Sequence, residues 1–274
     1  MTGPPPHCKV IGIEDFEDAE LVGLIRDVWQ AGANALPDFP RGHEHRKQWE
    51  VAMALRALRE GGVLRTDAEA LGVGAGFEPT IFWLTRHIAR VFATDLYLDS
   101  GEWGEANRLM LTDPEACWPE EWNPRRLVVQ HMNALELRYP DDSFDAVFSS
   151  SSIEHFGDRA QVRRAAEEMH RVLRPGGTAS ISTEMRLQGP PPGALGLTMF
   201  TPEELLGTLV EGIGWKPLSE FDAAISDATL AGAINFEDAL RPPPQNPVGA
   251  PSVPHLVLRL GEWVFTSCHL ALRK

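Results

Sequence analysis

The stretch Glu69-Ala70-Leu71-Gly72-Val73-Gly74-Ala75-Gly76-Phe77-Glu78-Pro79 is an apolar run that passes into three alternating glycines. It predicts a strand, a tight turn and the start of a helix. Glycines alternate in such a turn because the backbone adopts positive φ and passes close to a ligand, where a Cβ would collide. The stretch therefore predicts a ligand site at the end of a strand, although a plain strand-to-helix connection uses the same residue types.

Two classes of nucleoside ligand use this geometry, namely dinucleotides and S-adenosylmethionine. The dinucleotide pattern G-x-G-x-x-G fails in both registers, because Pro79 or Phe77 stands where the third glycine is required. Glu78 would also place a carboxylate where a pyrophosphate needs bare N–H groups. S-adenosylmethionine carries no phosphate, and its ammonium group suits a carboxylate. The turn therefore favours S-adenosylmethionine over NAD.

Two further strand ends carry polar residues suited to a nucleoside. Residues 90–95 predict a buried strand that ends in Asp95, about 20 residues past the glycines, the spacing at which an acid accepts hydrogen bonds from ribose hydroxyls. The alternative is an acid that only caps the next segment. Residues 126–133 predict a third strand, and the Asn133 amide at its end can accept a hydrogen bond from an adenine amino group beside Met132.

Strands and helices alternate through the rest of the core. Residues 144–149 predict a fourth strand, residues 158–174 an amphipathic helix, and residues 178–183 a fifth strand. This alternation predicts an α/β fold with a doubly wound, mainly parallel, Rossmann-like sheet, whose ligands gather at the carboxyl ends of the strands.

The segments on either side of this core predict additional elements. Apolar residues at helical spacing predict helices near residues 21–29 and 44–60, which are either packing scaffold or a lid over the ligand. Residues 186–198 predict a flexible cover, residues 201–211 a helix and residues 215–221 a sixth strand. Residues 241–254 predict an irregular proline-rich stretch, and residues 255–272 a terminal hairpin. We predict an N-terminal helical cap over residues 1–65, a cofactor-binding core over 66–185, and lid segments with the last strands over 186–274.

Composition limits the class of partner. The net charge of −14 over 274 residues and the absence of a long basic run argue against a nucleic-acid partner. Three widely spaced cysteines indicate neither a disulfide framework nor a zinc site. No apolar stretch has the length of a membrane span. We expect a cytoplasmic protein that acts on a small molecule without a membrane partner, as a monomer or a homodimer.

Six short motifs together resemble the class I S-adenosylmethionine-dependent methyltransferases. The motifs follow the family's order and spacing between residues 69 and 184. They are Gly72-Val73-Gly74-Ala75-Gly76, Ala93-Thr94-Asp95, Asn133-Ala134, Asp142-Ser143-Phe144-Asp145-Ala146-Val147, Ser152-Ile153-Glu154-His155 and Arg171-Val172-Leu173-Arg174-Pro175-Gly176-Gly177. The resemblance implies a seven-stranded sheet with an antiparallel last strand, and S-adenosylmethionine as cofactor.

The resemblance also implies which residues bind the cofactor. These are Gly72, Gly74, Gly76, Glu78, Asp95, Leu96, Met132, Asn133, Ala134 and Ser150. The chain departs from the family pattern at three of them, since Gly72 replaces its usual acid, Glu78 its third glycine and Asn133 its usual aspartate. We therefore expect Glu78 to supply the negative charge that Gly72 lacks.

Three residues are candidates for the catalytic base, because a hydroxyl acceptor must lose a proton. His155 is the first candidate, since its unperturbed pKa lies near physiological pH, and its replacement by alanine is expected to abolish turnover but not cofactor binding. Glu154 and Glu184 are alternative bases, or ligands of a magnesium ion. The run His43-Glu44-His45 lacks a third ligand at a suitable spacing, so we predict no metal site there.

The sequence therefore predicts a methyltransferase, with O-methylation of a small molecule such as a sugar or another polyhydroxylated metabolite as the leading interpretation. The long segments expected to cover the site favour an enclosed acceptor pocket. Two alternatives stay open at this point: an N- or C-methyltransferase acting on a secondary metabolite, and a cofactor-binding protein without transferase activity.

Overall fold

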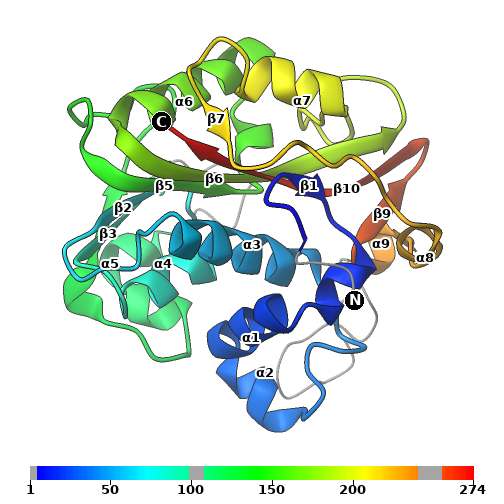
Figure 1. Cartoon of the computed structure of the whole chain (residues 1–274), viewed down its shortest axis with the longest axis horizontal. Coiled ribbons are helices and arrows are strands. Elements are labelled where there is room, and N and C mark those ends of the chain that lie inside the picture. The colour runs from blue at the N-terminus through cyan, green and yellow to red at the C-terminus, as the bar shows by residue number, and fades with distance from the viewer. Residues whose placement is uncertain (1–4, 99–107, 240–254) are drawn as a thin grey trace.

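The computed structural model describes residues 5–98, 108–239 and 255–274, and one mixed sheet runs through it (Figure 1). Its main strands, in spatial order, are β4 (Leu127–His131), β3 (Arg90–Asp95), β2 (Glu69–Val73), β5 (Phe144–Ser150), β6 (Leu173–Gln188) and β10 (Trp263–Arg273). Neighbouring strands from β4 to β6 are parallel, whereas β10 is antiparallel to β6. The predicted doubly wound sheet with an antiparallel C-terminal strand is confirmed.

Short strands cover the outer edge of β10. They are β9 (Val257–Leu260), β1 (Lys9–Val10) and β7 (Lys216–Pro217), and β8 (Ile234–Asn235) pairs with β9 in turn. The seven strands of the predicted sheet correspond to β2 to β7 and β10. Strands β9 and β10 form the expected terminal hairpin, and β1 and β8 are additions. The strand predicted over residues 215–221 is reduced to the two residues of β7, although the Leu218 N–H still donates to the Ala271 carbonyl of β10 at 2.9 Å.

Helices cover both faces of the sheet (Figure 1). The α-helices are α1 (Ala19–Val28), α2 (Gln30–Ala35), α3 (Arg46–Glu60), α4 (Pro79–Leu84), α5 (Leu109–Thr112), α6 (Arg159–Val172), α7 (Pro202–Leu209), α8 (Asp227–Ala231) and α9 (Phe236–Ala239). The described residues also contain the 3₁₀ turns η1 (Ile13–Glu17), η2 (Pro114–Cys117), η3 (Pro124–Arg126) and η4 (Ile153–His155).

Helix α3 packs on one face of the sheet and runs in the direction opposite to the parallel strands. A capping box begins it, in which the His45 ring accepts from the Lys47 N–H at 3.0 Å and the Gln48 side chain accepts from the His45 N–H at 3.2 Å. Its last turn reaches the amino end of β6, where a Cβ on Gly61 would lie 2.1 Å from the Thr178 hydroxyl. Its first turn therefore lies at the carboxyl edge of the sheet, where ligands are expected.

The segment predicted as a flexible cover, residues 186–198, is packed instead. Strand β6 continues to Gln188, and Ala194, Leu197 and Met199 are buried against Leu258. Proline and glycine signalled a break in regular structure here, but apolar side chains hold the segment onto the β9–β10 hairpin. The proline-rich stretch 241–254 lies outside the described residues. The three-part division at residues 65 and 185 stays a prediction.

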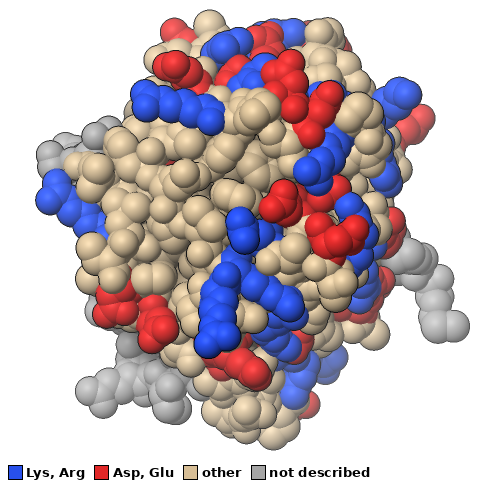
Figure 2. All heavy atoms as spheres, turned by 90° about the vertical axis from the view of Figure 1, so that its left-hand side faces the viewer, with Lys and Arg blue, Asp and Glu red and all other residues tan. Residues whose placement is uncertain are grey.

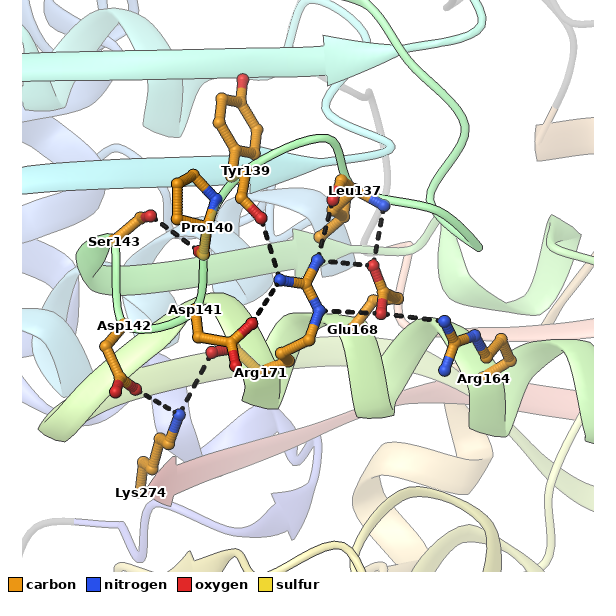
Figure 3. Close-up of polar contacts among 10 residues, drawn as sticks. All are labelled: Leu137, Tyr139, Pro140, Asp141, Asp142, Ser143, Arg164, Glu168, Arg171 and Lys274. Carbon is orange, nitrogen blue, oxygen red and sulfur yellow. Dashed lines mark hydrogen bonds and ion pairs between the residues drawn. The ribbon is translucent and has the colours of Figure 1, made fainter.

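The loop between β4 and β5 is held by Arg171 of α6 (Figure 3). Its guanidinium donates to the carbonyls of Leu137 and Tyr139, both at 2.8 Å, and pairs with Asp141 and Glu168 at 2.8 Å. Glu168, whose side chain is only 4% exposed, also accepts from the Leu137 N–H at 2.9 Å. One arginine therefore fixes the connection between two strands that carry residues of the predicted site.

The amino edge of the parallel strands lies on the left of Figure 1, and Figure 2 shows that side of the molecule. Acidic and basic side chains there border a broad uncharged area, so charges of both signs are intermixed on this face. Across residues 5–98, 108–239 and 255–274, each helix is too short or too polar to cross a bilayer.

Candidate functional site

The glycine turn after β2 is packed so closely that side chains are excluded. Gly74 has φ of 61°, and a Cβ there would lie 2.7 Å from the Phe156 ring and 2.8 Å from Ser152. The Ser152 hydroxyl donates to the Gly74 carbonyl at 2.5 Å. Gly76 has φ of 47°, and a Cβ on Gly72 would lie 2.9 Å from the Phe148 ring. The alternating glycines therefore let the β5–α6 loop close over the turn.

Asp95 ties the end of β3 to this turn. Its carboxylate accepts from the Gly76 N–H at 2.8 Å and from the Leu96 N–H at 2.7 Å. The Tyr97 hydroxyl donates to the Gly76 carbonyl at 2.7 Å. Each carboxylate oxygen can accept more than one hydrogen bond, so these two contacts do not exhaust the acceptor capacity of Asp95.

Apolar and amide side chains surround the ends of β3 and β4. Phe77 and Leu96 are 38% and 39% exposed, which is unusual for large apolar residues beside a polar turn. At the neighbouring strand end, Met132 is half-buried and donates its N–H to the Asp95 carbonyl at 2.9 Å, and Ala134 is buried. The Asn133 side chain accepts from the Leu135 N–H at 2.9 Å. An amide oxygen has a second lone pair, so Asn133 keeps the capacity predicted for it.

Glu78 begins α4 and lies on the other side of the turn. Burial raises its pKa to about 7, and the negative charge of Glu50 adds to the effect. The Thr80 hydroxyl donates to Glu78 at 3.1 Å. A carboxyl group so desolvated gains most from a cationic ligand, because a positive charge restores its ionised form.

The first turn of α3 contributes three charged residues that sequence reasoning did not single out. Arg46 and Glu184 form a close ion pair with side chains only 12% and 4% exposed. Lys47 pairs with Glu50 at 3.1 Å, and Glu50 also accepts a short hydrogen bond from the Ser267 hydroxyl. In the sequence these residues look like the solvated start of an amphipathic helix. The only indication that they lie near the site was the interpretation of the early helices as a lid.

Glu154 and Glu184 are both buried, and their side chains lie on opposite sides of β6. Glu154 accepts from the Thr183 hydroxyl at 2.8 Å, whereas Glu184 pairs with Arg46. Successive side chains of a strand point to opposite faces, so β6 lies between the two acids. His155, on the same turn as Glu154, is exposed. The structure thus places two of the three candidate bases in buried positions and His155 at the surface.

The free energy of unfolding should depend on the ionisation of Glu154. Burial, reinforced by the charge of Glu184, raises the pKa of Glu154 from 4.5 to about 8. Between these values the unfolded chain releases the proton while the folded chain keeps it, so stability falls as pH rises through this window. Glu154→Gln cannot ionise and should therefore gain stability relative to wild type between about pH 5 and about pH 8. Urea unfolding of wild type and Glu154→Gln at about pH 5 and about pH 8 measures the two free energies of unfolding. The same difference between the proteins at both pH values would contradict the prediction.

Many buried polar atoms at this edge lack a hydrogen-bond partner among the described residues. These atoms are Ser182 Oγ, Glu184 Oε2, Arg46 Nε, Glu44 Oε2 and His255 Nε2. The nearby Ser150 and Ser151 hydroxyls interact with the carboxylates of Glu78 and Glu50. Buried polar groups without partners are costly, so such a cluster marks a place where a ligand or water supplies the missing bonds. The unpartnered atoms come from β6, the start of α3 and the segment before β9, which all meet here.

His255 joins the C-terminal hairpin to the start of α3. Its N–H donates to the Glu44 carbonyl at 2.7 Å, its carbonyl accepts from the Arg46 N–H at 3.0 Å, and its ring lies 4.2 Å from the His45 ring. Burial and the neighbouring cation of Arg46 lower the pKa of His255 to about 4. Both rings are neutral at physiological pH. In the part of the chain that the structure describes, His, Cys, Asp and Glu side chains do not gather in threes suited to a metal ion.

Comparison with known proteins agrees with this geometry. Residues 71–181 match the methyltransferase domain family. A segment of 65 residues is 42% identical to 27-O-demethylrifamycin SV methyltransferase of Amycolatopsis mediterranei, covering 24% of this chain and 23% of that protein. A segment of 95 residues is 38% identical to a probable S-adenosylmethionine-dependent methyltransferase of Mycolicibacterium smegmatis, covering 33% of this chain and 36% of that protein. The chain thus matches between about a quarter and a third of the length of these relatives.

Among solved structures, an S-adenosylmethionine-dependent methyltransferase from Mesorhizobium loti superposes on 83% of this chain and 98% of its own. The two chains are 20% identical, and the TM-score is 0.48.

Proposed function

Because residues 71–181 form a methyltransferase domain of the class I S-adenosylmethionine-dependent type, we propose that the chain catalyses methyl transfer to a hydroxyl group of a small molecule. A sugar or another polyhydroxylated metabolite is the acceptor class proposed. The observation that carries this proposal is the cluster of unpartnered polar atoms between the start of α3 and β6. Hydroxyl groups both donate and accept hydrogen bonds, as this mixture of atoms requires.

The residues present fit S-adenosylmethionine. Asp95 would hold the ribose, Leu96, Met132 and Asn133 the adenine, and Glu78 the methionine ammonium. The glycines Gly72, Gly74 and Gly76 would let the turn pass close to the ligand, and Ser150 and Ala134 would line the ligand's path. When bound, the cofactor supplies an electrophilic methyl group on a sulfonium. The protein's own part is then to align the acceptor oxygen, exclude water and accept the proton that the hydroxyl loses.

Replacing Glu78 with glutamine should weaken S-adenosylmethionine binding more than binding of a ligand without the ammonium. Glutamine keeps the size and the Thr80 contact but removes the charge, and a hydrogen bond to a charged group contributes about 1.5–3 kcal/mol. We expect Kd to rise about 10- to 150-fold by calorimetry. Glu115→Gln, on η2 away from the turn, is the control. An unchanged Kd would show that another group binds the ammonium.

Calorimetry also separates the proposed function from its alternatives. Binding of S-adenosylmethionine and S-adenosylhomocysteine, followed by methyl release over a panel of sugars and phenols, supports the O-methyltransferase. Turnover only with amine or carbon acceptors indicates an N- or C-methyltransferase. Binding without turnover across all acceptor classes indicates a cofactor-binding protein, and affinity for NAD alone would overturn the proposal.

A further inference from the structure

The ion pair between Arg46 and Glu184 leaves one donor and one acceptor unused in a buried position. Glu184 uses Oε1 for Arg46, while Glu184 Oε2 and Arg46 Nε have no partner among the described residues. A buried ion pair is normally completed by further hydrogen bonds, because desolvation otherwise outweighs the attraction of the charges. This pair is therefore built to receive an additional group that donates one hydrogen bond and accepts another.

The surroundings of the pair show where that group would lie. Ser267 of β10 stands opposite Glu184, and both belong to the face of the sheet on which α3 packs. Ser182, two residues before Glu184, points to the same face and pairs in register with Ser150 at the end of β5. The Ser182 hydroxyl is also unpartnered, whereas the Ser150 hydroxyl interacts with Glu78. A line of polar groups thus leads from Glu78, at the glycine turn, to the ion pair.

The charge of the pair limits the chemistry of its ligand. Arg46 is already balanced by Glu184, so a carboxylate or phosphate would meet the negative charge of Glu184 at close range. A neutral polyhydroxylated ligand suits the pair, since one hydroxyl can donate to Glu184 Oε2 while a neighbouring oxygen of the same molecule accepts from Arg46 Nε.

We propose that the Arg46–Glu184 pair binds a polyhydroxylated acceptor, with Glu184 Oε2 as the base for the reacting hydroxyl and Arg46 Nε–H as the donor to a neighbouring oxygen. This inference rests on the proposed O-methylation and assigns its residues. The acceptor oxygen forms the new C–O bond to the methyl carbon, the C–S bond breaks with its electron pair kept on sulfur, and the hydroxyl proton passes to Glu184. Arg46 keeps its positive charge beside the oxygen on which negative charge develops.

Binding of polyols tests the site without turnover. Saturation-transfer NMR measures the binding of myo-inositol and of methyl α-D-glucopyranoside to the full chain. The measurements are made in the presence of S-adenosylhomocysteine. The wild-type protein should give a signal with at least one probe, and the double variant R46M/E184M should lose it. This double variant leaves no unpaired buried charge, so its fold is expected to persist. R174M, which removes an ion pair with Asp145 at the opposite end of β6, is the matched control and should keep the signal.

Turnover tests the assigned roles on whichever hydroxyl acceptor the wild type methylates. E184Q should lower kcat about 10²- to 10⁴-fold, the usual loss of a general base. R46K keeps the charge but not the planar fork, and should lower kcat about 10²- to 10³-fold. In both variants the Kd of S-adenosylhomocysteine should stay unchanged, which a collapsed site would not allow.

Several outcomes would overturn the inference. They are no probe bound by the wild type, equal signals from wild type and R46M/E184M, or a large loss of kcat in H155A with none in E184Q. A failure of the proposed function looks different. In that case the wild type binds neither S-adenosylmethionine nor S-adenosylhomocysteine, or methylates only amine or carbon acceptors, while polyol binding still reports on the pair.

Discussion

Replacing Arg171 with methionine should lower the free energy of unfolding by about 3 kcal/mol, toward the lower end of the cost of breaking a buried ion pair. The change leaves the carbonyls of Leu137 and Tyr139 without their donor, and it removes one of the two arginines that balance the buried Glu168 (Figure 3). Arg164 still pairs with Glu168, so the loss stays below the upper end of that range. Urea denaturation of the two proteins measures the difference.

Arg164 offers a matched control for this experiment. It pairs with the same carboxylate at 3.0 Å, but its side chain is 54% exposed. Exposed ion pairs contribute about 0–1 kcal/mol, so Arg164→Met should be close to wild type. Equal losses in the two variants would mean that the charge on Glu168, and not the bonds to the β4–β5 loop, sets the stability of this region.

Replacing Asp95 with alanine should raise the Kd of S-adenosylhomocysteine about 10- to 150-fold, which corresponds to the loss of a charged hydrogen-bond partner. The Asp95 carboxylate accepts a hydrogen bond from the Gly76 N–H at 2.8 Å, which fixes the turn. It also lies at the strand end where ribose hydroxyls would donate to it. Calorimetry with S-adenosylhomocysteine measures the effect and does not require an acceptor.

Asp67→Ala is the control for Asp95→Ala. Asp67 precedes β2, its side chain is 78% exposed, and it pairs with Arg65 at 2.9 Å. Its loss should leave the Kd unchanged. If Asp95→Ala also bound S-adenosylhomocysteine with wild-type affinity, the ribose would lie elsewhere, and the assignment of the cofactor to the ends of β2 and β3 would be wrong.

The meeting of the glycine turn with Asp95 was predictable because its signals are local. Positive φ at Gly74 and Gly76 restricts those positions to glycine, so the turn is visible in the sequence itself. Asp95 ends a buried apolar run, and parallel strands place their carboxyl ends at one edge of the sheet. Knowing the order of the strands was therefore enough to bring the glycines and Asp95 together.

The segment over residues 186–198 shows where local signals fail. Its prolines and glycines indicated a flexible cover, yet Ala194 and Met199 are buried against the C-terminal hairpin. Proline and glycine report the absence of regular structure, which says nothing about packing. Whether an irregular segment is packed depends on the apolar surface that a distant part of the chain presents to it.

By itself, the sequence determined the strand–turn–helix core, the parallel sheet and the meeting of the glycine turn with Asp95, because periodicity and backbone conformation are properties of neighbouring residues. Only the tertiary structure decided that the first turn of α3 reaches the same edge and that Arg46 pairs with Glu184, 138 positions further along the chain. A contact between residues so distant depends on the direction in which α3 packs across the sheet. That direction is set by the burial of the whole helix, and no short motif records it.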